Sequence, residues 1–178
     1  MKRTMTGLLM GLVLAFQAQA TEVKTVAAVD LDRYLGLWYE VASFPNYFQR
    51  KCTGDVSAQY NKREDGRIEV INRCRLHDGK FDQAIGLANT VEGSGNAKLR
   101  VKFTPSWLSW LPIGWGDYWI IGLAPDYSYA VVSDSKREYL WILSRTPSMT
   151  EQHYKTAVDK AAAQGFDVKK LVKTRQGQ

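Results

Sequence analysis

Short runs of alternating polar and apolar residues recur along most of the chain and predict a protein built from β-strands. Residues 55–60 show the pattern most clearly, because their even positions are apolar and their odd positions polar, as in a strand with one buried face. Turn residues such as those at 64–67 and 78–79 separate the runs. The predicted strands are 38–44, 55–60, 67–72, 80–89, 97–103, 117–123, 127–133 and 138–144. Eight short strands joined mostly by hairpins predict an all-β fold, an eight-stranded antiparallel up-and-down barrel.

One helix is predicted after the last strand. Ser148 and Glu151 form a capping box that starts it, and Gly165 ends it. Four apolar residues follow at helical spacing along one face: Tyr154, Ala157, Val158 and Ala161. That face is expected to pack on the outside of the barrel, and residues 168–172 could add a short strand after it.

An aromatic residue in the first predicted strand and a basic residue after the last one predict that the barrel closes. Gly36 lets the chain bend as it enters the first strand, and Trp38 follows two residues later. Arg145 ends the last strand, and a guanidinium can stack on an indole face. These side chains can meet only if the first and last strands are neighbours, which is the arrangement in a closed barrel.

The first 20 residues have the pattern of an export signal. Lys2 and Arg3 precede the apolar run 8–16, and Ala18-Gln19-Ala20 is a small-residue cleavage site. We expect cleavage after Ala20, which leaves residues 21–178 as one domain and lowers the formal charge of +6 by two. The apolar run is too short to span a bilayer, and no cysteine stands near the cleavage site to carry a lipid anchor. The mature protein is therefore expected to be soluble, and periplasmic or secreted.

Composition limits the other classes of partner. The basic residues near the C-terminus lack the interleaved aromatic residues of a nucleic-acid surface, so no nucleic-acid partner is expected. The segments that carry Cys52 and Cys74 read as the consecutive strands of one hairpin in an exported chain, which predicts a disulfide between them. Two free thiols, or a register that keeps them apart, are the alternatives. With His77 alone beside them they do not form a recognised metal-ligand set, and no metal or cofactor is expected.

Three short motifs resemble the signatures of the lipocalin family, in the order and spacing of that family. The first is Gly36, Trp38 and Tyr39; the second is Asp126 and Tyr127, where Pro125 replaces the usual threonine; the third is Arg145. Further segments resemble the bacterial lipocalins, the branch that is similar to apolipoprotein D. The resemblance covers nearly all of residues 21–178. It implies a barrel that holds a small hydrophobic ligand, but the missing anchor cysteine argues against carrying over attachment to the outer membrane.

Strand parity proposes which side chains line the barrel. The candidates for ligand binding are Glu40, Tyr60, Asn72, Phe103, Tyr118, Ile120 and Trp141. They form an aromatic and aliphatic wall with a few polar groups, as is usual in pockets for lipids or small apolar ligands. The alternative is that these side chains only fill the barrel, and for Trp38 and Arg145 a plug at the closed end is expected. Glu40 needs a partner if it is buried and could pair with Arg145 or a tyrosine.

The connection between the fifth and sixth predicted strands is rich in tryptophan. Trp107 and Trp110, with Trp115 and Trp119 further on, are placed in a loop that should rim the open end. Exposed tryptophans require a contact. The loop could be a lid, a transient contact with a membrane surface through Trp107 and Trp110, or the contact of a weak homodimer in a protein that is otherwise a monomer.

These features favour non-covalent binding of a fatty acid or lysophospholipid, for storage or transport, with the polar head near the mouth. A lipocalin-fold enzyme, an isomerase or hydrolase acting on a lipid-like substrate, is the alternative from another class. It is disfavoured because His77 and His153 are far apart in the sequence and no Gly-x-Ser-x-Gly motif is present. A tetrapyrrole or pigment binder is the third possibility, and it would be coloured when purified.

Overall fold

A computed structural model describes residues 22–103 and 114–177 of the chain. The predicted signal peptide with its cleavage after Ala20 lies outside these residues, and so do Trp107 and Trp110. Within the described part, no helix combines the length and the apolar character needed to cross a membrane.

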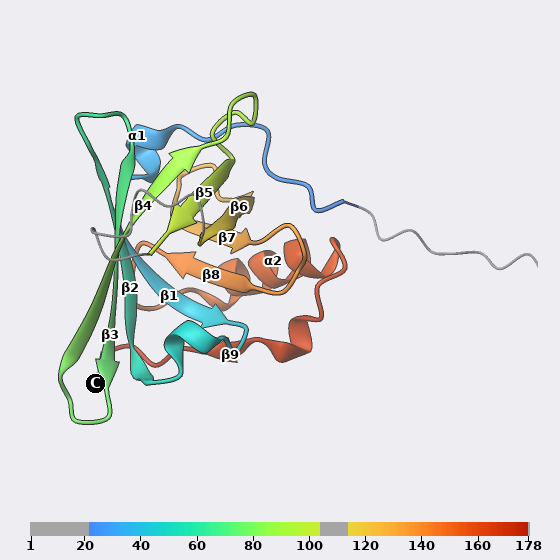
Figure 1. The fold of residues 1–178 in the computed structure, drawn as a ribbon. Coiled ribbons are helices and arrows are strands. Elements are labelled where there is room, and N and C mark those ends of the chain that lie inside the picture. The colour runs from blue at the N-terminus through green and yellow to red at the C-terminus, as the bar shows by residue number, and fades with distance from the viewer. Residues whose placement is uncertain (1–21, 104–113, 178) are drawn as a thin grey trace, which may run out of the picture.

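Eight antiparallel strands form the closed barrel that the sequence predicts. They are β1 (Gly36–Ser43), β2 (Cys52–Lys62), β3 (Ile68–Leu76), β4 (Phe81–Thr90), β5 (Lys98–Lys102), β6 (Trp115–Leu123), β7 (Tyr129–Ser133) and β8 (Leu140–Ser144). Each strand pairs with the next, and β1 pairs with both β2 and β8, which closes the sheet. Figure 1 shows the strands wrapped around a common interior. Because β2 and β6 are four strands apart in this order, they lie on opposite sides of the barrel.

Side-chain alternation divides the hydrophobic residues into two cores. In β8, Trp141 and Leu143 point into the barrel, whereas Leu140 and Ile142 belong to the second core outside it. The register between β1 and β8 shifts between Glu40 and Ala42. This irregularity turns Ala42 to the outer core, although Trp38 on the same strand lies in the inner one.

The helix α2 (Glu151–Ala162) covers the outer core beside β6 and β7 (Figure 1). Ala157 and Ala161 are fully buried, and their small side chains let the helix approach the sheet closely. The predicted outer position of the helix is confirmed, but the predicted cap is wrong. The hydroxyl of Thr150, not Ser148, accepts a hydrogen bond from the backbone N–H of His153 at 3.2 Å.

Two short helices that the sequence analysis did not predict lie at the ends of the barrel. The helix α1 (Leu31–Tyr34) is capped by Asp30, whose carboxylate accepts from the N–H groups of Asp32 and Arg33. It precedes β1 at the closed end and positions Tyr34. The 3-10 helix η1 (Tyr47–Gln49) lies between β1 and β2 at the other end.

After α2 come a second 3-10 helix, η3 (Val168–Lys170), and a two-residue strand, β9 (Val172–Lys173). Most of the proposed strand 168–172 is therefore wrong, although a short strand does follow the helix. β9 pairs with β1 opposite Ala42 and Ser43.

Residues 174–177, which we call the tail, then join β1 to β2 where these two strands separate. Thr174 N–H donates to the carbonyl of Val41 at 2.9 Å, and Asp55 N–H donates to the carbonyl of Arg175 at 2.7 Å. The Gln176 amide donates to the carbonyls of Glu40 and Val56, both at 2.8 Å. Position 54 must be glycine for this approach, since a Cβ there would lie 2.7 Å from the carbonyl oxygen of Arg175. The tail therefore seals the seam between the two strands.

Trp115 and Trp119 belong to β6 rather than to the loop in which the sequence analysis placed them. Both alternate with the inward-facing Tyr118 and so lie on the outer side of the strand. The ammonium group of Lys98 lies 3.9 Å from the Trp119 ring centroid. Trp119 thus contacts a lysine ammonium group on the outer side of the sheet and does not contribute to a lid.

Candidate functional site

Trp38 and Arg145 close one end of the barrel. The Arg145 guanidinium carbon lies 3.8 Å from the centroid of the Trp38 ring, which is fully buried. Arg145 also donates to the carbonyls of Leu37 (2.9 Å), Arg33 (2.6 Å) and Tyr34 (3.1 Å). The Trp38 indole N–H donates to the carbonyl of Tyr34 at 2.8 Å. One cation thus connects the start of β1, the short helix α1 and the end of β8.

The turn between β6 and β7, which carries the second signature, supports the same end. Asp126 accepts from the N–H and hydroxyl of Ser128 at 3.0 and 2.7 Å. The hydroxyl of Tyr127 accepts from the backbone N–H of Asp30 at 2.9 Å, and the Arg33 guanidinium lies 4.0 Å from the Tyr127 ring centroid. The carbonyl of Pro125, which stands where the family has threonine, accepts from Arg33 at 3.1 Å. The signature residues therefore hold α1 against the barrel.

Three tyrosine hydroxyls meet inside the barrel above this plug. Tyr118 on β6 lies 2.7 Å from the hydroxyl of Tyr34 and 2.8 Å from that of Tyr60 on β2. Tyr34 and Tyr60 are 3% and 5% exposed. Burial raises the pKa of Tyr60 to about 12 and raises the pKa values of Tyr34 and Tyr118 as well. All three hydroxyls therefore keep their protons at neutral pH.

The middle of the barrel is lined by small residues on one side. Asn72 on β3 lies directly opposite Ala58 and Ala84, and Val70 lies opposite Gly86. Directly opposite residues of an antiparallel pair share a face of the sheet, and Ala58 and Val70 belong to the inner core. The inner face of β2 to β4 thus leaves room in front of it.

Several inward-facing residues remain accessible to water even though they line the inside of a closed sheet. Strand pairing with core residues sets their direction, and each is exposed or half-buried; they are Asn72, Ala84, Val101, Gly116, Tyr118 and Trp141. A filled barrel would cover these positions as completely as it covers Ile120 or Leu99. The interior is therefore open around its middle and toward the mouth.

Phe103 follows β5 at the open end and reaches back over the inner face of β4. A Cβ on Gly86 would come within 2.6 Å of the Phe103 ring and 2.7 Å of the carbonyl oxygen of Lys102. The absence of a side chain at Gly86 is what allows the Phe103 ring to lie there. Phe103 is 40% exposed, so it forms part of the rim.

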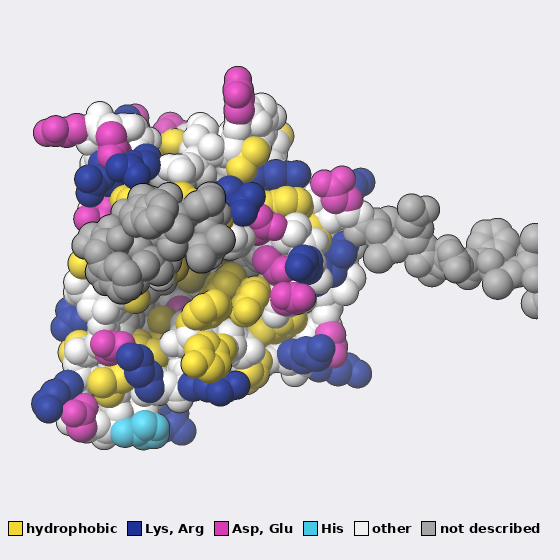
Figure 2. All heavy atoms as spheres, in the orientation of Figure 1, with side chains coloured by type: hydrophobic (Ala, Val, Ile, Leu, Met, Phe, Trp, Pro, Cys, Tyr) yellow, Lys and Arg dark blue, Asp and Glu magenta, His cyan; other side chains and the backbone are white. Residues whose placement is uncertain are grey.

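A row of aromatic rings leads from the surface into the barrel on the opposite side of the mouth. The Phe48 ring centroid lies 5.8 Å from that of Tyr139, which stacks on Trp141 at 5.5 Å. Phe48 is 68% exposed, whereas Trp141 is half-buried inside the barrel. Figure 2 shows hydrophobic side chains gathered over η1 and the start of β8. The three rings thus form a continuous aromatic surface from the exterior to the inside of the barrel.

Glu40 is buried in the wall of the open half and is 4% exposed. Its carboxylate accepts from the hydroxyls of Ser43 (3.0 Å) and Thr174 (2.5 Å) and from the Gln49 amide (2.5 Å). Neither of the partners that the sequence analysis left open, Arg145 or a tyrosine, contacts this carboxylate among the described residues. Burial raises the pKa of Glu40, and the three donors oppose that effect in part. Glu40 therefore fastens η1 and the tail to β1.

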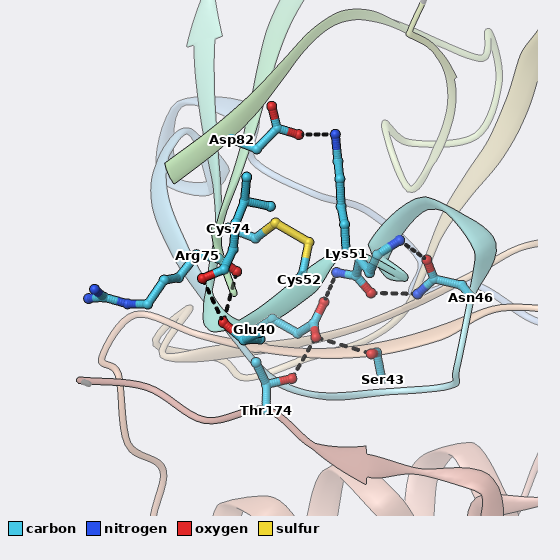
Figure 3. The surroundings of a disulfide bond; sticks show 12 residues. Glu40, Ser43, Asn46, Lys51, Cys52, Cys74, Arg75, Asp82 and Thr174 are labelled. Carbon is cyan, nitrogen blue, oxygen red and sulfur yellow. Dashed lines mark hydrogen bonds and ion pairs between the residues drawn. A yellow bond between two sulfur atoms is a disulfide. The ribbon is translucent and has the colours of Figure 1, made fainter. Parts of the chain in front are cut away.

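The predicted disulfide between Cys52 and Cys74 is confirmed and lies beside this cluster (Figure 3). It joins the start of β2 to β3, and the two Cα atoms are 5.6 Å apart. Lys51 and Asp82 form an ion pair next to it, at 2.5 Å. The disulfide thus fixes β2 to β3 covalently at the mouth, next to η1, where the aromatic row begins.

The structure brings most of the predicted lining residues into one interior. Tyr60 and Ile120 lie in the inner core, Tyr118 and Trp141 pack against it, and Asn72 and Phe103 lie closer to the mouth. Sequence reasoning missed Tyr34, Gln49 and Thr174. Asp30 before Leu31 is a helix-capping signal that could have placed Tyr34, but no local signal predicts that Gln49 and Thr174 reach Glu40.

The outer face of β1 to β4 carries a separate groove of about 550 Å³. Its lining includes Leu37, Tyr39, Ile71, Arg73 and Phe81, which alternate with the inward-facing residues of the same strands. The groove is on the other side of the sheet from the tyrosine hydroxyls. It therefore offers control positions that share strands with the interior site but not its space.

The two histidines do not assemble a catalytic or metal site. His77 lies in the turn between β3 and β4, and the His153 ring on α2 lies 5.4 Å from that of Tyr129 outside the barrel. Within the described ranges no cluster of three His, Cys, Asp or Glu side chains could hold a metal ion.

Comparison with known proteins decides the family. Residues 29–176 match the model of the lipocalin-like domain. The chain belongs to the lipocalin family. Temperature-induced lipocalin-1 of Arabidopsis thaliana is 43% identical over 157 residues, which cover 87% of this chain and 83% of that protein. The outer membrane lipoprotein Blc of Escherichia coli K12 is 36% identical and covers 86% and 83%, and mouse apolipoprotein D is 33% identical and covers 83% and 77%.

The solved structures support the lipocalin architecture. Insecticyanin from the tobacco hornworm Manduca sexta superposes with a TM-score of 0.72 at 15% sequence identity, over 92% of this chain and 89% of that one. At this identity the agreement concerns the fold alone. The resemblance to bacterial lipocalins and apolipoprotein D is confirmed, and the barrel is that of a family whose members bind small hydrophobic ligands.

Proposed function

We propose that this lipocalin binds one fatty acid or lysophospholipid in the barrel interior, and stores or transports it as an exported, soluble protein. The observation that carries the proposal is the set of inward-facing residues that remain accessible inside a closed barrel, from Tyr118 up to Trp141. An interior that is apolar on most of its wall and open at its middle suits an alkyl chain.

Burial of the alkyl chain supplies most of the affinity. Each methylene that leaves water contributes about 0.8 kcal/mol, so a long single chain gains several kcal/mol after the cost of association. The small residues Ala58, Ala84 and Gly86 give the chain room, and the aromatic row from Phe48 to Trp141 gives it a path.

Binding rather than catalysis is the function that the side chains support. The Glu40 carboxylate already accepts three hydrogen bonds, and the tyrosines hold their protons, so neither is a ready general base. The relatives named as lipoproteins and apolipoproteins agree with a lipid ligand. Export with cleavage after Ala20, no lipid anchor, and a monomer or weak homodimer remain part of the proposal. A transient membrane contact through Trp107 and Trp110 would complete the delivery route.

Native mass spectrometry of the exported protein, purified without detergent, tests the proposal. The expected spectrum shows a bound lipid mass that is lost on denaturation, a chain that begins at Thr21, and a two-hydrogen deficit from the disulfide. If the empty protein also refuses added palmitate and lysophosphatidylcholine, the lipid-binding function is wrong. Visible colour, or turnover of an added lipid, would point to the pigment or enzyme alternatives instead.

A further inference from the structure

The three tyrosine hydroxyls form a polar floor across the barrel. Tyr60 and Tyr118 come from β2 and β6, which lie on opposite sides of the barrel, and Tyr34 rises from α1 at the closed end. Their contacts of 2.7 and 2.8 Å therefore cross the interior and separate the open space from the Trp38–Arg145 plug. Tyr118 is the member that remains partly accessible, so the floor faces the open interior.

The three hydroxyls lack one hydrogen-bond acceptor among themselves. Three hydroxyls carry three O–H donors but make two hydrogen bonds with one another. Either the Tyr118 hydroxyl accepts hydrogen bonds from both neighbours and its own O–H has no acceptor, or Tyr118 donates to one neighbour and the O–H of that neighbour has none. No other described residue contacts these hydroxyl groups through a hydrogen bond. A buried donor without an acceptor is unfavourable, so the floor suits a molecule that brings lone pairs.

The charges around the floor favour a negative group there. Arg145 lies directly below, its hydrogen bonds go to backbone carbonyls, and no described carboxylate forms an ion pair with it. The buried acid Glu40 is far from the floor. Gly36 lies opposite Tyr60, and Glu40 is four residues further along β1, about 13 Å toward the mouth.

We propose that the Tyr34–Tyr60–Tyr118 floor is the head-group site of this lipocalin, where it binds the carboxylate of a free fatty acid that enters head first. This inference rests on the proposed lipid-binding function and selects between its two ligand classes. A carboxylate accepts several hydrogen bonds, which suits three hydroxyl donors above the Arg145 cation, whereas a phosphocholine head also brings a quaternary ammonium that this cation repels. The head lies at the floor rather than near the mouth, contrary to the expectation from the sequence.

Ligand series on the unmodified protein give the first test and need no variant. Palmitate is expected to bind at least about tenfold more tightly than methyl palmitate or palmitoyl-lysophosphatidylcholine, because a hydrogen bond to a charged group is lost in each. Palmitate with a pyrene at its ω carbon should still bind, since head-first entry leaves that end at the mouth. Equal or tighter binding of the lysophospholipid would overturn the head-group site and leave lipid binding intact.

A variant with all three tyrosines replaced by phenylalanine gives the second test. It keeps the rings and removes all three hydroxyls together, so no hydroxyl is left without its partner. The affinity for palmitate should fall about tenfold or more, and its advantage over methyl palmitate should disappear. Tyr39→Phe in the outer groove is the matched control and should change neither. A triple variant that folds and keeps the palmitate preference would refute the inference, whereas a wild-type protein that binds no lipid would refute the proposed function as well.

Discussion

Replacing Arg145 with alanine should destabilise the closed end of the barrel more than a change at any other arginine in the described chain. The substitution removes three hydrogen bonds to the carbonyls of Leu37, Arg33 and Tyr34 and one cation–π contact with Trp38. Two of these carbonyls are accessible to water, so we count about 0.5–1 kcal/mol for each of the three bonds rather than the larger value for buried charged bonds. The cation–π contact adds about 1 kcal/mol.

The expected loss in the free energy of unfolding is therefore about 3 kcal/mol. With a urea dependence of about 2 kcal/mol per molar, the unfolding midpoint should fall by about 1.5 M. Urea unfolding at pH 7, followed by tryptophan fluorescence, measures the midpoint and the slope together. Arg145→Lys should lose about half as much, because an ammonium can sit on the ring but cannot reach all three carbonyls.

A double-mutant cycle with Trp38→Phe isolates the stacking contact, and the coupling should be about 0.5–1 kcal/mol. Arg63→Ala, an exposed hairpin arginine, is the control and should have little effect. A loss below about 1 kcal/mol in Arg145→Ala, or a coupling near zero, would show that this cation does not hold α1, β1 and β8 together.

Three further predictions concern the open half of the barrel. Burial raises the pKa of Glu40, so its stabilising contribution is fully present below the unfolded pKa and is lost as the pH rises through the folded one. Glu40→Gln should therefore flatten the decline in stability above the ordinary glutamate pKa of 4.5, and an unchanged pH profile by thermal unfolding would contradict this. Gly86→Ala should displace Phe103 and the carbonyl of Lys102, which should lower the free energy of unfolding by about 1–3 kcal/mol and weaken lipid binding in titrations. Gly79→Ala is the comparison, because Gly79 has a positive φ and open space around it, so that change tests backbone strain without a steric clash. Removal of the disulfide by Cys52→Ser with Cys74→Ser frees a loop of sequence separation 22 and should cost about 3 kcal/mol; identical unfolding curves for wild type and variant without reductant would argue against it.

The elements that the sequence predicts well are those with a short-range signal. Strand alternation gave the eight strands, and the pair Trp38 and Arg145 required the first and last strands to be neighbours. The cysteines were placed correctly because they lie in consecutive hairpin strands, which fixes their approach once the register is right.

The parts that were missed depend on contacts between distant segments. Glu40 meets Thr174, 134 positions away, and nothing in either neighbourhood indicates it. Tyr34 lies in a helix of four residues that the Asp30 cap alone suggests. The helix begins two residues later than the Ser148 capping box predicts, because Thr150 adopts the extended cap conformation and accepts from the N–H of His153. Sequence pattern thus predicts the wall of the barrel and the Trp38–Arg145 pair, but not the contacts that Tyr34, Gln49 and Thr174 make inside it.

The seam between β1 and β2 is completed only by the last residues of the chain, so it is the last part of the barrel that can form. Both strands leave the ribosome early, but the residues that hold their separated halves together, Thr174 to Gly177, follow every strand of the barrel. A chain that emerges N-terminus first, from the ribosome or during export, can therefore close the lower barrel while its upper edges remain unpaired and exposed to other chains. A protein shortened before Val172 would keep that exposed edge permanently, and its aggregation, rather than its fold, would be the visible defect.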